Sequence, residues 1–128
     1  MKVRLSKWVK WRPKEKKAGV YLLGIFDKVP SRVNPTDKNI VYIGETCKSL
    51  NSRWRQFERS AFRKLSGHSG GKTFVKKKCN KQNLWISYFT PSDSLTCEQR
   101  TACIRYVERM LIWNFVKKHK KYPKCNKK

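Results

Sequence analysis

A nearly continuous apolar run, GVYLLGIF at residues 19–26, constrains the fold more than any other feature of the sequence. It lacks the alternation of a strand that has one face in water, so it predicts a strand covered on both faces. The run is far too short to span a bilayer, and no other stretch is better suited. We therefore expect a sheet built around this strand, and no membrane as a partner.

Two further apolar segments predict strands. IVYIG at 40–44 follows a loop at 27–39 that is rich in polar residues and proline, which suggests a hairpin with a long connection. LWISYF at 84–89 has the aromatic and β-branched residues of a third strand. Both segments extend the sheet expected around the first strand.

Apolar residues at steps of three or four predict two helices. One begins after Cys47, and the other runs from about Thr96 to His119 behind a turn whose Asp93 or Ser94 can cap it. The order strand, strand, helix, strand, helix predicts an α/β chain of the α+β type. Its sheet is small and three-stranded, and helices flank it.

The chain carries a large positive charge. Its 128 residues hold 32 Lys and Arg against 8 Asp and Glu, a formal net charge of +24. Self-repulsion on this scale works against the compact state, so a polyanion is the natural partner, and nucleic acid is the commonest one. The length suits one domain, which we divide into a basic N-terminal arm at 1–17 and a single domain with a basic tail at 18–128.

The cysteines indicate a reducing compartment. They number five, an odd count, and no Cys-x-x-Cys pair occurs, which argues against a disulfide framework or a zinc site. The basic N-terminus is not followed by the apolar segment of a secretory signal. We therefore expect a cytoplasmic protein with reduced thiols.

The final predicted helix places one carboxylate within its apolar stripe. At about 100° per residue, Glu108 projects between Ile104 and Ile112. A buried carboxylate needs a cation or dense hydrogen bonding, since desolvating it alone costs several kcal/mol. Two interpretations stay open: an internal salt bridge to an arginine, or a ligand for Mg²⁺, which suits a lone carboxylate completed by waters and phosphate oxygens.

Two more side chains can serve the same chemistry. Arg53 borders the apolar stripe of the first predicted helix, so it is pre-oriented to pair with Glu108 or to clamp a phosphate. His68 lies in a polar stretch between glycines. It is either a surface residue or, with an arginine and an acid nearby in space, a proton shuttle.

Five motifs in order resemble the GIY-YIG nuclease family. Gly19-Val20-Tyr21 and Tyr42-Ile43-Gly44 are similar to its two tyrosine motifs, although the connection between them is longer than the family's. The segments around Arg53 and Glu108 and the closing Pro123-Lys124-Cys125-Asn126 are similar to the family's arginine, glutamate and Pro-x-x-Asn elements. Each motif alone is weak, but five in order over nearly the whole chain are a strong signal.

The resemblance implies a role for each matched residue. Glu108 would hold a single divalent cation, Mg²⁺ with Mn²⁺ as a substitute, and Arg53 would neutralise charge on the transition state. Tyr21 would take the proton from the attacking water, supported by Tyr42 and His68. A phenol titrates near pH 10, so a nearby cation must lower the pKa of Tyr21 first, and the sequence does not show which one.

Two supporting roles are implied as well. Gly44 would let the sugar–phosphate backbone approach without a β-carbon in the way. Asn126 would orient a neighbouring side chain or hold the C-terminus in place.

The implied function is a metal-dependent endonuclease that hydrolyses phosphodiester bonds in double-stranded DNA, as a nickase or as a double-strand cutter. By analogy it would act on phage, host or competitor DNA in a bacterium or a phage-infected cell, as a monomer or homodimer without an obligate protein partner. The alternative is a non-catalytic basic module that binds DNA or RNA. Such a module, however, has no need of an acid in an apolar stripe.

Contacts with DNA are expected from the catalytic domain itself, because the chain leaves no room for a separate binding domain. Arginines and lysines of the arm, the long loop, the first helix and the basic stretch after it supply the cationic surface. The candidates are Arg12, Arg32, Arg55, Arg59, Lys72, Lys76, Lys77 and Lys78. Trp8 and Trp11 either pack on the sheet or contact bases.

Overall fold

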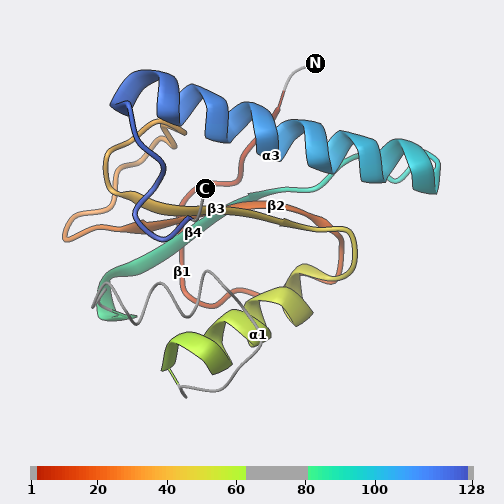
Figure 1. Cartoon of the computed structure of the whole chain (residues 1–128). Coiled ribbons are helices and arrows are strands. Elements are labelled where there is room, and N and C mark those ends of the chain that lie inside the picture. Colours follow the sequence, from red (N-terminus) through yellow and green to blue (C-terminus); the bar gives the residue numbers. More distant parts are fainter. Residues whose placement is uncertain (1–2, 63–80, 127–128) are drawn as a thin grey trace.

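A computed structural model describes residues 3–62 and 81–126 of the chain (Figure 1). Its four-stranded antiparallel sheet has the order β1-β4-β2-β3. The strands are β1 (Val9–Lys10), β2 (Gly19–Ile25), β3 (Ile40–Thr46) and β4 (Leu84–Phe89). The helices are α1 (Leu50–Phe62) and α3 (Cys97–His119), and a short 3-10 turn, Lys81–Asn83, precedes β4.

The central strand is covered on both faces, as its apolar run predicts. Figure 1 shows α1 and α3 on opposite sides of the sheet. Tyr21 and Leu23 of β2 belong to the core under α1, whereas Val20 and Leu22 belong to the core under α3. The alternating side chains of one strand thus fill two separate hydrophobic layers.

The sheet confirms the predicted α+β class and its three strands, and it adds a fourth. The N-terminal arm, whose order the sequence leaves open, runs along β4 and contributes β1, with Val9 opposite Ile86. Ser6 extends this pairing, since its N–H donates to the carbonyl of Tyr88 at 2.8 Å. Trp8 is buried in the core, edge-on to Phe26 with ring centroids 4.9 Å apart.

The final helix begins at Cys97, close to the expected Thr96, but its capping residue differs from the expected ones. Thr96 is its N-cap and forms a capping box with Gln99, in place of the expected Asp93 or Ser94. The Thr96 N–H donates to Gln99 Oε1 at 2.8 Å, and the Gln99 N–H donates to Thr96 Oγ1 at 3.1 Å. At the other end the helix stops after His119, where Lys120 takes the left-handed conformation with φ 63°.

The free edge of β3 is partly covered by the C-terminal tail. The N–H of Cys125 donates to the carbonyl of Val41 at 2.7 Å. The side-chain amide of Asn126 then accepts from the N–H of Ile43 and donates to its carbonyl, both at 2.9 Å. Asn126 therefore holds the C-terminus in place, one of the two roles that the resemblance implied for it. None of the helices in these described ranges is long and apolar enough to cross a membrane.

Candidate functional site

Two tyrosines lie side by side on the face of the sheet that α1 covers. Tyr21 comes from β2 and Tyr42 from the edge strand β3, and their ring centroids are 5.9 Å apart. Tyr21 is fully buried, whereas Tyr42 keeps 9% of its surface exposed. Trp54 of α1 packs edge-on against Tyr21 at 6.1 Å and closes the cluster from the helix side.

Gly44 makes room for both rings. It lies opposite Tyr21 in the β2–β3 pairing. A β-carbon at this position would come within 2.5 Å of the Tyr42 ring and 2.9 Å of the Tyr21 hydroxyl oxygen. Packing alone therefore explains why a glycine occupies this position, because any larger side chain would displace the two tyrosines.

Arg53 joins the two phenols to α1. Its guanidinium hydrogen-bonds both Tyr21 and Tyr42, and Tyr42 also hydrogen-bonds Tyr21. A further bond from Nη1 to Gln56 Oε1, at 3.0 Å, fixes the group from one turn along the helix. A half-buried arginine with three such partners is held in one orientation, as the position of Arg53 beside the apolar stripe predicts.

The electrostatics of the tyrosines favour their neutral form. Burial raises the pKa of Tyr21 well above its ordinary value, and the charges of Tyr42 and Glu108 add to this while Arg53 opposes it. Burial likewise raises the pKa of Tyr42, again against the influence of Arg53. Arg53 is therefore the cation that the sequence left unidentified. Its charge does not outweigh burial, so both phenols are protonated at neutral pH.

Glu108 approaches this cluster from α3, on the other side of the sheet. Its side chain is 20% exposed, and the flanking Val107 and Leu111 are buried in the core. Burial raises the pKa of its carboxyl, the charge of Glu45 raises it further, and Arg109 lowers it. Its field reaches both Tyr21 and Tyr42.

The interpretation of Glu108 as half of an internal salt bridge finds little support. In the described part of the chain it has one ion pair, with Arg109 at 3.7 Å. That arginine is the next residue in the helix and is 86% exposed, so water screens the pair strongly. Because this pair offsets little of the desolvation cost of Glu108, a cation that binds the carboxylate more strongly would stabilise it.

A cleft of about 430 Å³ opens between the start of α1 and the flank of α3. Glu45 and Arg105 are among the lining residues that were not singled out from the sequence. Arg105 lies three positions before Glu108 and shares its side of α3, so helical spacing alone was sufficient to find it. Glu45 directly follows Gly44, but its proximity to Glu108 depends on how α3 crosses the edge strand.

The donors present fit a hard divalent cation. Glu108 and Glu45 are carboxylates close enough to raise the proton affinity of Glu108, and a cation between them would relieve that repulsion. No group of three or more His, Cys, Asp or Glu side chains converges among residues 3–62 and 81–126. Mg²⁺ is commonly held by one or two carboxylates together with waters and substrate oxygens, so it suits this donor set better than zinc does.

The predicted cationic contacts are dispersed. Arg12 pairs with Glu58 at 3.8 Å, and the indole N–H of Trp11 donates to the same carboxylate at 2.9 Å, which ties the arm to α1. The exposed side chains of Arg32, Arg55 and Arg59 do not line the cleft. His68, Lys72, Lys76, Lys77 and Lys78 lie outside the described residues.

Comparison of the chain with protein-family models, with curated proteins and with solved structures found no match. Function is therefore inferred from the residues, their motifs and their geometry. The observation that bears on it most directly is that four elements bring two tyrosines, an arginine and a half-buried glutamate together at one edge of the sheet.

Proposed function

We propose that this protein is a divalent-metal-dependent endonuclease of the GIY-YIG type that hydrolyses phosphodiester bonds in double-stranded DNA. The convergence of Tyr21, Tyr42, Arg53 and Glu108 carries the proposal. These residues are far apart in the sequence, and their motifs were the basis of the resemblance. Their electrostatic coupling in the structure supports a shared role.

Glu108 is the proposed ligand of the cation, with Glu45 beside it. These carboxylates would hold Mg²⁺, or Mn²⁺ in its place, which would supply Lewis-acid chemistry at the phosphate. The carboxylate of Glu108 is suited to this role because it is partly desolvated and weakly paired. Glu108 lies within the 23-residue helix α3, which fixes its backbone position relative to the edge strand.

Arg53 is the proposed clamp on the scissile phosphate. Its hydrogen bonds to two phenols and to Gln56 fix the guanidinium before any substrate arrives. Such preorganisation stabilises charge that develops in the transition state without reorganisation at the moment of reaction. The arginine also lines the cleft, where a phosphate can reach it.

The tyrosines are proposed to act mainly as neutral hydrogen-bonding groups. Full burial and a raised pKa argue against the proton-acceptor role that the resemblance implied for Tyr21, at least before cation and substrate bind. Tyr21 is better suited to positioning Arg53. Tyr42, which remains slightly exposed, is the phenol placed to orient an attacking water.

The raised pKa of Tyr21 is also the observation that favours the second candidate, a basic module that binds nucleic acid without cutting it. Incubating the protein with supercoiled plasmid and Mg²⁺ separates the two. We expect nicked or linear DNA from the wild type, none from Glu108→Gln, and full activity from Glu98→Gln, an exposed glutamate of the same helix. Binding without cleavage by the wild type supports the second candidate.

A further inference from the structure

A second cavity adjoins the cleft, at the N-terminal end of α3. It has a volume of about 270 Å³ and lies against the loop that joins β3 to α1. Lys17, Lys48 and Arg100 line it together with Asp93, the one carboxylate among its described lining residues. Cys47 and Lys48 line both the cavity and the cleft, so the two spaces adjoin at these residues.

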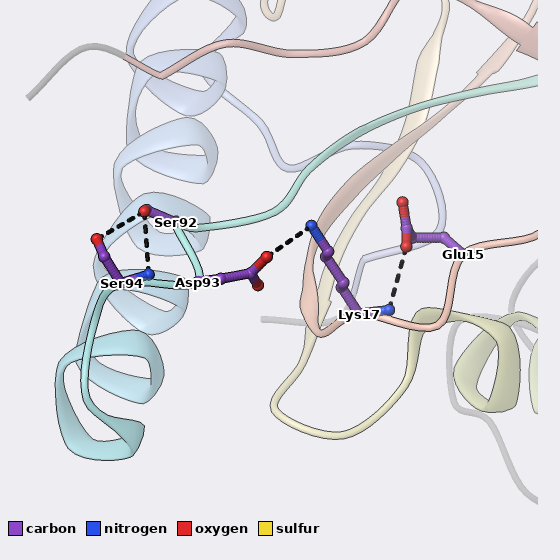
Figure 2. A network of polar contacts seen from close by, with 5 residues as sticks. All are labelled: Glu15, Lys17, Ser92, Asp93 and Ser94. Atoms are coloured by element: carbon purple, nitrogen blue, oxygen red, sulfur yellow. Dashed lines mark hydrogen bonds and ion pairs between the residues drawn. The ribbon is translucent and has the colours of Figure 1, made fainter.

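Asp93, the carboxylate of this cavity, already forms an ion pair with a lysine. Asp93 Oδ2 lies 3.1 Å from Lys17 Nζ, as Figure 2 shows. The same lysine is anchored through its main chain, since its N–H donates to Glu15 Oε2 at 3.2 Å. Lys17 and Asp93 therefore offset each other and form one wall of the cavity.

The other two cations remain uncompensated. Neither Lys48 nor Arg100 has an ion pair with any residue in the described part of the chain. Together with Arg53 and Arg105 of the cleft, they bring to four the positive side chains, besides Lys17, among the described residues that line these two spaces. Positive side chains gathered next to a proposed phosphate site attract a second anionic group.

The start of α1 cannot take that anion through its backbone. The N–H groups of Leu50 and Asn51 donate to the carbonyls of Lys17 and Glu15, both at 2.9 Å. The N–H of Ser52 donates to Ser49 Oγ at 3.3 Å. The start of α1 thus leaves an anion near this loop to other groups, and Lys48 and Arg100 are the cavity's lining cations without an ion pair among the residues that the structure describes.

We infer that this cavity binds a non-scissile phosphate of the cleaved strand, the one that neighbours the phosphate at Arg53, and that Lys48 and Arg100 hold it. The inference rests on the proposed function for its substrate, and it fixes the direction in which the strand leaves the cleft, toward the first turn of α3. Contacts with backbone phosphates fix the register and orientation of the protein on the DNA, and they do not read the base sequence.

Alkylation of the cysteines tests the inference without any turnover. Cys97 lines the cavity but not the cleft, and both Cys97 and Cys47 are exposed, whereas Cys125 is buried. The full chain is treated with N-ethylmaleimide in EDTA, with and without a saturating DNA duplex, and modification is followed by mass spectrometry. We expect the duplex to slow alkylation of Cys97 and Cys47. Unchanged alkylation of Cys97 under saturation overturns the inference.

A charge-matched pair of variants tests the assigned cations. Lys48→Gln/Arg100→Gln should weaken binding of the same duplex in EDTA by roughly ten-fold. It should also make the slope of log K against log salt concentration shallower by about one, because the two cations hold one phosphate. The control, Lys117→Gln/Lys118→Gln, removes the same charge from exposed positions in the last turn of α3, at the end of the helix away from the cavity, and should change affinity about two-fold or less. Equal losses in the two variants contradict the inference.

These measurements separate the failure of the inference from failure of the proposed function. If the wild type cleaves plasmid but DNA does not protect Cys97, the phosphate site is wrong and the nuclease assignment stands. If Cys97 is protected and the cavity variant loses affinity while no condition yields cleavage, the cavity is a phosphate site for bound DNA and the nuclease assignment is wrong.

Discussion

Gly44 lies opposite Tyr21 across the β2–β3 pair, and a β-carbon on Gly44 would come within 2.9 Å of the Tyr21 hydroxyl oxygen. The phenol therefore occupies the space that a side chain of the edge strand would otherwise fill. Because Arg53 takes its orientation from both phenols, this one glycine sets the geometry of the proposed phosphate clamp.

Replacing Gly44 by alanine should damage the site more than the fold. The added methyl forces the two tyrosine rings to move, at a cost of about 1–3 kcal/mol in the free energy of unfolding. We expect urea unfolding to show this loss and plasmid cleavage to disappear. Gly24→Ala is the control, since its β-carbon would meet Phe26 and Trp8 in the other core. It should lower stability and leave measurable cleavage, and equal loss of cleavage in both variants would contradict the role of Gly44.

Arg53→Lys should abolish most cleavage although it keeps the charge. A lysine ammonium cannot reproduce the planar guanidinium that bonds two phenols and Gln56, so its charge is no longer fixed toward the cleft. The cleavage rate should fall roughly 100-fold. Arg55→Lys, an exposed arginine of the same helix, should cleave like the wild type. A rate for Arg53→Lys close to that of Arg55→Lys would mean that only charge matters at this position.

The pH dependence of the Tm of the metal-free protein should show that the ionised form of Glu108 destabilises the fold. Its pKa is raised in the folded state, so its contribution to stability is fully present below the ordinary value of 4.5 and is lost as pH rises through the raised pKa. In EDTA, Glu108→Gln should therefore have a higher Tm than the wild type at neutral pH, and the difference should vanish in acid. Mg²⁺ should raise the Tm of the wild type more than that of the variant. A Glu108→Gln protein that is less stable at neutral pH in EDTA would show that the carboxylate is well paired.

Asn126→Ala should loosen the edge strand that carries Tyr42. It leaves the N–H and carbonyl of Ile43 without their side-chain partner, which should cost about 1–3 kcal/mol. Chemical unfolding measures this loss, and amide exchange at Ile43 should become faster. Lys124→Ala, an exposed neighbour in the tail, serves as the control. If the two variants are equally stable, the tail does not secure the strand.

Much of the fold could be predicted because its signals are local. The apolar run of β2 and the stripes of the two helices specify what is buried. The fourth strand escaped prediction because β1 is two residues long and its place is set by backbone pairing of the arm with β4. The cap of α3 was readable, since Thr96 and Gln99 have the spacing of a capping box, although two other capping residues stand just before it.

The candidate site likewise has features that the sequence predicts and features that only the fold determines. The motifs single out Tyr21, Tyr42, Arg53 and Glu108, and the structure brings all four together. It also shows what spacing cannot show, that Tyr21 is fully buried and that its phenol is neutral at physiological pH. Such burial depends on the register of β2 against β3 and on the packing of Trp54, which only the folded chain determines.

Direct measurement of cation binding tests the central claim most sharply. The wild-type chain and Glu108→Gln are titrated with Mn²⁺, and bound ion is followed by electron paramagnetic resonance, with Glu98→Gln as the matched control. We predict one site that competes with Mg²⁺ in the wild type and in Glu98→Gln, and a loss of affinity of at least about ten-fold in Glu108→Gln. Identical Mn²⁺ binding by all three proteins, or none by the wild type, would contradict the account.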